Sequence, residues 1–378
     1  INLRSPYYIG TTYTNTAYGT LDISIWSGSY SNTSPVTAQY SLRKNAIGTS
    51  VNVFFEISEL IKDYIDITFN GDYAGQTVWV NTVRNAYNSN NIVINSTPIT
   101  GTQLAFDSYS YFEEVQAATP PVLISNRELF VLDDNTFRVP IYTLTNPVVT
   151  FFKDGEVIAS ETFSSSSESA NQIKYVSIYG DDVNYDTFQE RVTDAGGSYE
   201  LNNCLQSFFD NFSIGAVDKI TVSDSSGIQT IKVNVIEECK YEPKKVTFIN
   251  KFGALQDMYF FKKSKENLSI KKESYKANII SASGTYDYTN HVNRDFNVVG
   301  KESISLSSGY LSEEYNEVFK QLLLSEKVWI TNIIESGEQV LPINVKTSSI
   351  AYKTSVNDKL VDYTIEFDKS FDTINNIR

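Results

Sequence analysis

The sequence predicts a mainly β protein, with two Ig- or fibronectin-like β-sandwich domains followed by a β-barrel-like domain with one packed α-helix. Short runs of alternating apolar and polar residues recur between turns rich in Gly, Asn and Ser. The clearest 3.6-residue apolar period belongs to a single segment near the C-terminus. The 378 residues are 41% hydrophobic and 13% aromatic, which is enough for two or three domains with their own cores.

Charge and loop signals predict three domains. Residues 1–118 carry a net charge of −4, the acidic stretch to residue 239 carries −11, and the remainder carries +1. Pro-containing loops at residues 117–121 and 242–245 coincide with these changes. We therefore expect an N-terminal β-sandwich over 1–118, an acidic Ig-like β-sandwich over 119–241, and a split-barrel-like β-plus-helix domain over 242–378.

The first two domains are predicted from strand and turn patterns. Residues 21–26, 51–55 and 78–83 read as strands, and the apolar spacing of residues 57–64 predicts one short helix. In the second domain, Asp154-Gly155 between two apolar runs predicts a tight type I′ hairpin turn. Several short strands joined by polar turns are typical of sandwiches.

The third domain has the clearest helix of the chain. Ser312 is the expected N-cap, followed by two acidic residues at the positive end of the helix dipole. The apolar stripe of this helix consists of Tyr315, Val318, Phe319, Leu322 and Leu323. Strands are expected at residues 328–333, 340–345, 348–354 and 360–367, and a sheet closed over one helix would pack them all.

The residue inventory argues against an enzyme. His291 is the only histidine, so a HExxH zinc site, which needs two, cannot be assembled, and a Ser–His–Asp triad would have to use His291. No G-x-S-x-G elbow or glycine-rich nucleotide loop occurs. Paired acids such as Glu113-Glu114 point to opposite faces of a strand. We expect no catalytic residue, no cofactor and a surface turn around His291.

One acidic loop spaces oxygen ligands as a calcium loop does. Asp182, Asn184 and Asp186 have the spacing, but Thr187 replaces the turn glycine and Thr193 stands where a bidentate Glu belongs. An exposed acidic loop is therefore the preferred interpretation, and calcium is the alternative.

The net charge of −14 argues against nucleic acid or an anionic membrane as the partner, and no run of 18 apolar residues exists. The first eight residues lack the features of a signal peptide. Two cysteines do not make a disulfide framework, so Cys204 and Cys239 are expected to be reduced, and a single bridge across the second domain is the alternative.

A lysine-rich segment gives the candidate assembly residues. Lysines gather after an aromatic run, where they can protect a strand edge or dock on an acidic neighbour. The candidate residues are Lys262, Lys263, Lys265, Lys271 and Lys272.

Residues 246–260, 302–315 and 327–330 resemble virion structural proteins of tailed bacteriophages, especially those of Bacteroidetes hosts. Residues 55–61 and 78–80 are similar to the sandwich domain that accompanies this part in such proteins. The resemblance implies a tail, baseplate or neck component, made in the host bacterial cytoplasm and assembled in the virion as a ring with copies of itself and other tail proteins. It implies no catalytic residue.

The main alternative is an adhesin or carbohydrate-binding protein that recognises host surface glycans, and a glycan depolymerase ranks third. Aromatic side chains bury a large surface area and have few rotatable bonds, so a high density of them suits a binding interface. The N-terminal aromatic residues are Tyr7, Tyr8, Tyr13, Tyr18, Trp26, Tyr30 and Tyr40.

Overall fold

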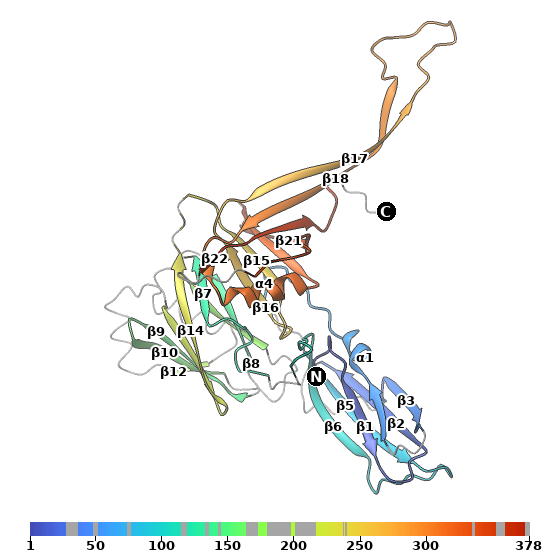
Figure 1. Cartoon of the computed structure of the whole chain (residues 1–378), viewed down its shortest axis with the longest axis vertical. Coiled ribbons are helices and arrows are strands. Elements are labelled where there is room, and N and C mark those ends of the chain that lie inside the picture. Colours follow the sequence, from blue (N-terminus) through green and yellow to red (C-terminus); the bar gives the residue numbers. More distant parts are fainter. Residues whose placement is uncertain are drawn as a thin grey trace. The chain divides into compact units, whose positions relative to one another are not determined.

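The protein is mainly β, as the sequence predicts, and its computed structural model is drawn in Figure 1. Two α-helices and open sheets, none closed into a barrel, make up the part of the chain that the structure describes. The described residues are 1–27, 37–47, 52–73, 77–114, 119–132, 136–142, 145–163, 173–179, 198–200, 217–236, 238, 240–334, 337–352 and 360–374.

The chain divides into two compact units. Unit 1 consists of Ile1–Glu237, Thr247–Met258 and Glu314–Ser325, and unit 2 of Glu238–Val246, Tyr259–Glu313 and Glu326–Arg378. The three domains expected from charge and loops stay a prediction. Unit 1 contains residues from all three of them, and unit 2 contains most of the third.

Unit 1 begins with a four-stranded antiparallel sheet and a separate strand pair. The strands of the sheet, in spatial order, are β3 (Tyr40–Asn45), β2 (Tyr18–Trp26), β5 (Thr77–Tyr87) and β6 (Ile99–Phe106). The pair consists of β1 (Tyr8–Thr12) and β4 (Asn52–Glu56), and the predicted short helix is α1 (Ser58–Lys62). Leu21, Ile23 and Ile61 are buried in a shared apolar core that joins these elements.

A second sheet of unit 1 contains the predicted Asp-Gly hairpin. Its strands, in spatial order, are β12 (Ser198–Glu200), β10 (Glu156–Thr162), β9 (Val148–Lys153), β13 (Lys219–Asp224), β14 (Gly227–Ile236) and β7 (Glu128–Leu132). Asp154 and Gly155 have φ angles of 50° and 86°, which confirms the expected positive-φ turn between β9 and β10. β8 (Thr136–Tyr142) and β11 (Ile173–Tyr179) form a further antiparallel pair.

The predicted long helix is α4 (Tyr315–Leu324), which belongs to unit 1. Ser312 is not its N-cap: that residue lies in β19 (Leu311–Ser312), and Glu314 occupies the cap position without a side-chain capping bond. The helix therefore begins two residues later than expected. Its buried face includes Phe319 and the fully buried amide of Gln321, whereas Leu323 is only partly buried. Strands β15 (Lys244–Ile249) and β16 (Leu255–Phe260) each have residues in both units.

Unit 2 is built on a sheet with an apolar face. The strands that lie wholly within it are hydrogen-bonded in the order β20 (Val328–Ile334), β21 (Gly337–Val345), β23 (Thr364–Lys369), β18 (Asn293–Ser307) and β17 (Lys265–Lys276). Ile304, Ile365 and Phe367 are buried on this sheet. The short strand β22 (Leu360–Val361) pairs with β19. The strand expected at 348–354 is wrong over residues 348–352, which lie outside any strand.

Candidate functional site

The predicted lysine segment lies at the start of the longest hairpin of unit 2. Lys265, Lys271 and Lys272 lie on β17, and all three side chains are exposed. Lys272 pairs with Asp295 of β18 at 2.6 Å. Lys262 instead contacts Glu238 at 2.7 Å, and this hydrogen bond holds the pKa of Glu238 below its usual range. Lys262 is thus paired within the chain, and the other lysines face solvent or the neighbouring strand.

The hairpin extends beyond the rest of its sheet. We call residues 265–302 the arm; they comprise β17, the loop at 277–292 and most of β18 (Figure 1). β17 pairs with β18 from Lys265 to Lys276, whereas β23 pairs only with residues 303–307 of β18. Every side chain of β17 is exposed. The part of β18 that belongs to the arm pairs with β17 and not with β23, so the arm is a two-stranded ribbon.

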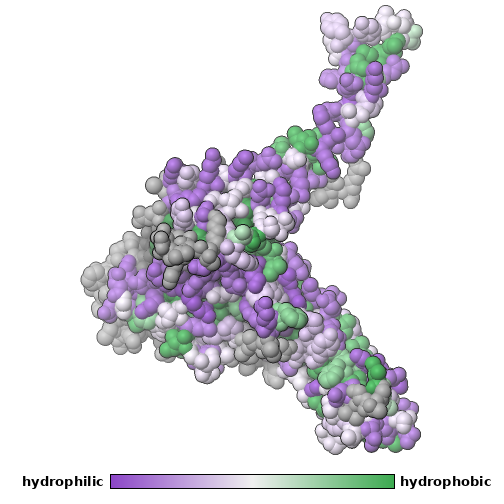
Figure 2. Space-filling model, in the orientation of Figure 1, coloured by the Kyte–Doolittle hydropathy of each residue, from purple (hydrophilic) through white to green (hydrophobic). Residues whose placement is uncertain are grey.

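The arm exposes apolar side chains among its charges, and Figure 2 shows both kinds along it. Its exposed large apolar residues are Leu268, Ile270, Tyr275, Ile280, Tyr286, Tyr288, Val292, Phe296 and Val298. Tyr275 and Phe296 pack edge to face with ring centres 5.7 Å apart. The sequence reasoning identified the lysines but missed these residues. The available signal was the alternation of Leu268 and Ile270 with polar residues in a strand with charged positions on either side.

A cavity of about 310 Å³ lies at the root of the arm in unit 2. Its apolar lining residues are Leu268, Ile304, Ile330 and Ile343, and its polar ones are Glu266, Asn267, Glu302, Ser303, Asn332 and Lys369. Lys369 donates a hydrogen bond to Glu302, which holds the pKa of that carboxylate below its usual range. The cavity thus combines aliphatic walls with an ion pair and hydrogen-bonding groups.

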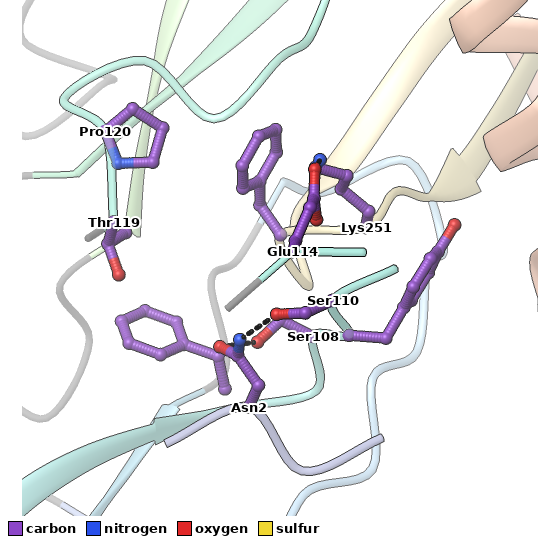
Figure 3. A pocket seen from close by; sticks show the side chains of 10 residues that line it. Asn2, Ser108, Ser110, Glu114, Thr119, Pro120 and Lys251 are labelled. Carbon is purple, nitrogen blue, oxygen red and sulfur yellow. Dashed lines mark hydrogen bonds and ion pairs between the residues drawn. The ribbon is translucent and has the colours of Figure 1, made fainter. Parts of the chain in front are cut away.

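A smaller polar pocket lies in unit 1, with a volume of about 60 Å³ (Figure 3). Asn2 links two serines: its amide donates to Ser110 Oγ at 2.9 Å, and its carbonyl accepts from Ser108 Oγ at 2.8 Å. Lys251 contacts Glu114 at 2.7 Å. Burial raises the pKa of Glu114, but the hydrogen bonds from Lys251 and the Tyr111 amide outweigh it and lower the pKa overall. This volume suits a few water molecules, and the polar groups bond to one another.

Helix α4 is held within unit 1 by polar contacts that the sequence did not predict. Tyr111 donates to Glu317 at 2.7 Å, and the Lys320 ammonium lies 3.4 Å from the centre of the Tyr111 ring. Burial, with the hydrogen bond to Glu317, raises the pKa of Tyr111. The buried amide of Gln321 donates to Ser125 Oγ at 2.6 Å. These contacts join the helix to residues that precede it by about two hundred positions.

A buried carboxylate lies elsewhere in unit 1, at Asp257. It accepts hydrogen bonds from Tyr73 and from Thr247, each at 2.7 Å. Its neighbours are hydroxyl donors that satisfy a buried charge. We read this cluster as structural.

The described residues hold no group of three or more His, Cys, Asp or Glu arranged for a metal ion. His291 lies exposed in the arm loop, and its backbone carbonyl accepts a bond from Arg294. Asp182, Asn184 and Asp186 of the possible calcium loop, and both Cys204 and Cys239, lie outside the described residues. No described helix is long and apolar enough to cross a membrane.

Tyr30 of the N-terminal aromatic residues lies outside the described residues, and Tyr18 and Tyr40 contact other side chains of unit 1. Tyr18 stacks on Tyr87 with ring centres 4.7 Å apart, and Arg43 covers its ring. Tyr40 packs edge to face against Tyr64. Tyr8, by contrast, is 64% exposed, and the register of β1 with β4 places it on the same face as the exposed Phe54.

Comparison with models of known protein families gives no match to this chain, and comparison with curated protein sequences gives none either.

Proposed function

We propose that this chain is a non-enzymatic structural protein of a tailed bacteriophage virion, in which copies assemble as a ring in the tail, baseplate or neck. The arm is the observation that carries the assembly part of the proposal. A two-stranded ribbon is marginally stable alone in water, and large exposed apolar surface marks an interaction site. The arm has both properties, so its folded form is best stabilised by a protein partner.

The virion part of the proposal rests on the sequence resemblance of residues 246–260, 302–315 and 327–330. Those segments contribute to β15, β16, β18 and β20, and the resemblance implies no catalytic residue in them. The partners would be copies of the chain and other tail proteins, and the protein would be made in the host bacterial cytoplasm. The protein would act only by packing its apolar and charged surfaces against these partners.

The finer fold assignment belongs to the same proposal. We assign residues 1–118 and 119–241 to two Ig- or fibronectin-like sandwiches and residues 242–378 to a split-barrel-like domain with one packed helix. The antiparallel pairing of β9 with β10 and β13 supports the sandwich assignment. The same sheet contains one parallel pair, β7 with β14. This pair is compatible with a sandwich in which β7 is an added edge strand.

The test is the state of the purified chain in electron micrographs and native mass spectrometry. The proposal expects closed rings of one copy number, and rings of the same copy number in isolated particles. A monomer that binds sugars in a glycan array would instead support the adhesin alternative, which the exposed Tyr8 and Phe54 favour. Substitution of both by Ala would then abolish glycan binding. Turnover of a host polysaccharide would overturn the non-enzymatic assignment.

A further inference from the structure

The cavity at the root of the arm has the character of a receptor for one side chain. Its volume of about 310 Å³ is at the small end of the range of ligand pockets. Ile304, Ile330 and Ile343 supply aliphatic walls. Glu266 and Glu302 supply carboxylate acceptors, against the single ammonium of Lys369. An aromatic ring with a hydroxyl donor matches this lining, because its ring is apolar and its tip needs a hydrogen-bond acceptor.

The tip of the arm, residues 277–292, presents such side chains. Tyr288 is 90% exposed and Tyr286 is 70% exposed. Hydrogen bonds fix the backbone around them: Ala277 N donates to Val292 O, Ser281 N donates to Thr285 O, and Thr289 N donates to the Asp287 carboxylate. A loop that is already ordered loses little conformational entropy on binding. Asp287 is the only Asp, Glu, Lys or Arg of the tip, so little charge is desolvated when the tip is buried.

The tip and the cavity of one chain are kept apart by the arm itself. Leu268 lines the cavity, and β17 continues from it through eight further residues to Lys276 before the tip begins. At roughly 3.3 Å per strand residue, the separation is about 26 Å. Figure 1 shows the hairpin running away from its sheet toward that tip. A tip residue that enters the cavity must therefore come from another molecule.

We infer that the arm tip of one copy inserts into the arm-root cavity of a second copy, with Tyr288 as the inserted side chain. Charge favours a second copy as the occupant. Residues 269–301, the part of the hairpin beyond its cavity-lining residues, hold five Lys or Arg against three Asp or Glu, a net charge of +2, whereas the rest of the chain carries −16. The hairpin can thus approach an acidic copy without the repulsion that the remaining surface would meet. A projection and a receptor on different parts of one chain give head-to-tail contacts, and such contacts form a closed ring when the rotation between neighbouring copies closes. This inference rests on the proposed assembly and specifies its contact.

Cross-linking between two differently tagged forms tests the contact. One form carries Tyr288→Cys and the other carries Asn332→Cys, in the lining of the cavity. The matched control replaces the first with Tyr310→Cys, which is 71% exposed in the same unit but outside both the tip and the cavity lining. Oxidation of the mixed forms should give a heterodimer at least tenfold faster than oxidation of the control pair. Both native cysteines are present in every form, so their background is the same.

A second measurement uses assembly itself. Tyr288→Ala should lower the ring fraction at a given concentration at least tenfold, whereas Tyr310→Ala should leave it unchanged. Wild-type rings with no preferred Tyr288–Asn332 cross-link would overturn this inference and leave the proposed function standing. An unchanged ring fraction in the Tyr288→Ala variant would likewise overturn this inference and leave the proposed function standing. A wild-type chain that stays monomeric at all concentrations would overturn both proposals.

Discussion

Strands β2 and β17 show how one sequence pattern leads to two outcomes. Both alternate apolar with polar residues, through Leu21, Ile23 and Ile25 in β2 and through Leu268 and Ile270 in β17. β2 lies between β3 and β5, and its apolar side chains are buried in the core of unit 1. β17 is the last strand of its sheet, and its apolar side chains are exposed. An apolar face left uncovered in the chain is surface available to another molecule. Mutations in the two kinds of region should accordingly change different measurements, stability in the first and assembly in the second.

The largest effect is expected in the buried region, at Phe319 of α4. This side chain is fully buried, so Phe319→Ala should lower the free energy of unfolding by about 3–5 kcal/mol. Urea unfolding followed by fluorescence and circular dichroism would measure the loss. Leu324→Ala on the same helix is the control, because that side chain is half exposed and should cost less than about 1 kcal/mol. Equal stability of the Phe319 variant and the wild type would contradict the burial of this helix face.

Two glycines with the same backbone angle sharpen the comparison. Gly253 in unit 1 has φ +76°, and a Cβ there would lie 2.9 Å from the backbone of Asp107. Gly284 in the arm tip has φ +77° and open space around it. Gly253→Ala should cost about 2–3 kcal/mol, from strain plus steric overlap, whereas Gly284→Ala should cost about 1 kcal/mol from strain alone. Thermal unfolding of both variants would show the difference, and similar shifts would mean that the tip is packed as tightly as the buried turn.

Charge reversal on the arm should change assembly without changing the fold. Lys263, Lys265 and Lys271 are exposed, so their joint replacement by Glu should leave the unfolding curve unchanged. Each exposed ion pair contributes about 0.5 kcal/mol, so the loss of three should weaken self-association by about tenfold. The difference in self-association between the variant and the wild type should shrink at high salt, because salt also screens the electrostatic attraction between wild-type copies. Sedimentation at low and high salt would measure it. Lys262 is left out because it pairs with Glu238.

The smallest effect is expected at the Glu114–Lys251 pair of unit 1. The pKa of Glu114 is lowered in the folded state, so the pair stabilises the fold above the ordinary glutamate pKa, and this stabilisation is lost as the pH falls through the lowered pKa. Glu114→Gln should lower stability at pH 7 by about 0.2–1 kcal/mol and flatten the decline toward acid. Glu113→Gln, at the exposed neighbouring position, is the control and should keep the wild-type profile. Parallel pH profiles for the wild type and Glu114→Gln would exclude a role for the pair.

Local features of this protein were determined by the sequence alone. The alternating runs predict a mainly β chain, and the structure confirms it. The Asp154-Gly155 turn follows from the backbone angles that these two residues tolerate, and α4 follows from its apolar period. Such signals are readable because each depends on residues only a few positions apart. The helix α4 begins two residues later than the sequence predicts, because Ser312 is a good capping residue that pairs in a short strand instead.

Only the tertiary structure decided which faces are covered. Gln321 is buried although its side chain is polar, because its amide donates a hydrogen bond to Ser125, almost two hundred residues earlier. Leu268 is exposed although it is an apolar residue, because no described strand or helix of unit 2 covers that part of the hairpin. The cavity at the arm root likewise combines side chains from β17, β18, β20, β21 and β23. Burial and concavity depend on distant segments meeting in space, and a period of two or 3.6 residues carries no information about which segments those are.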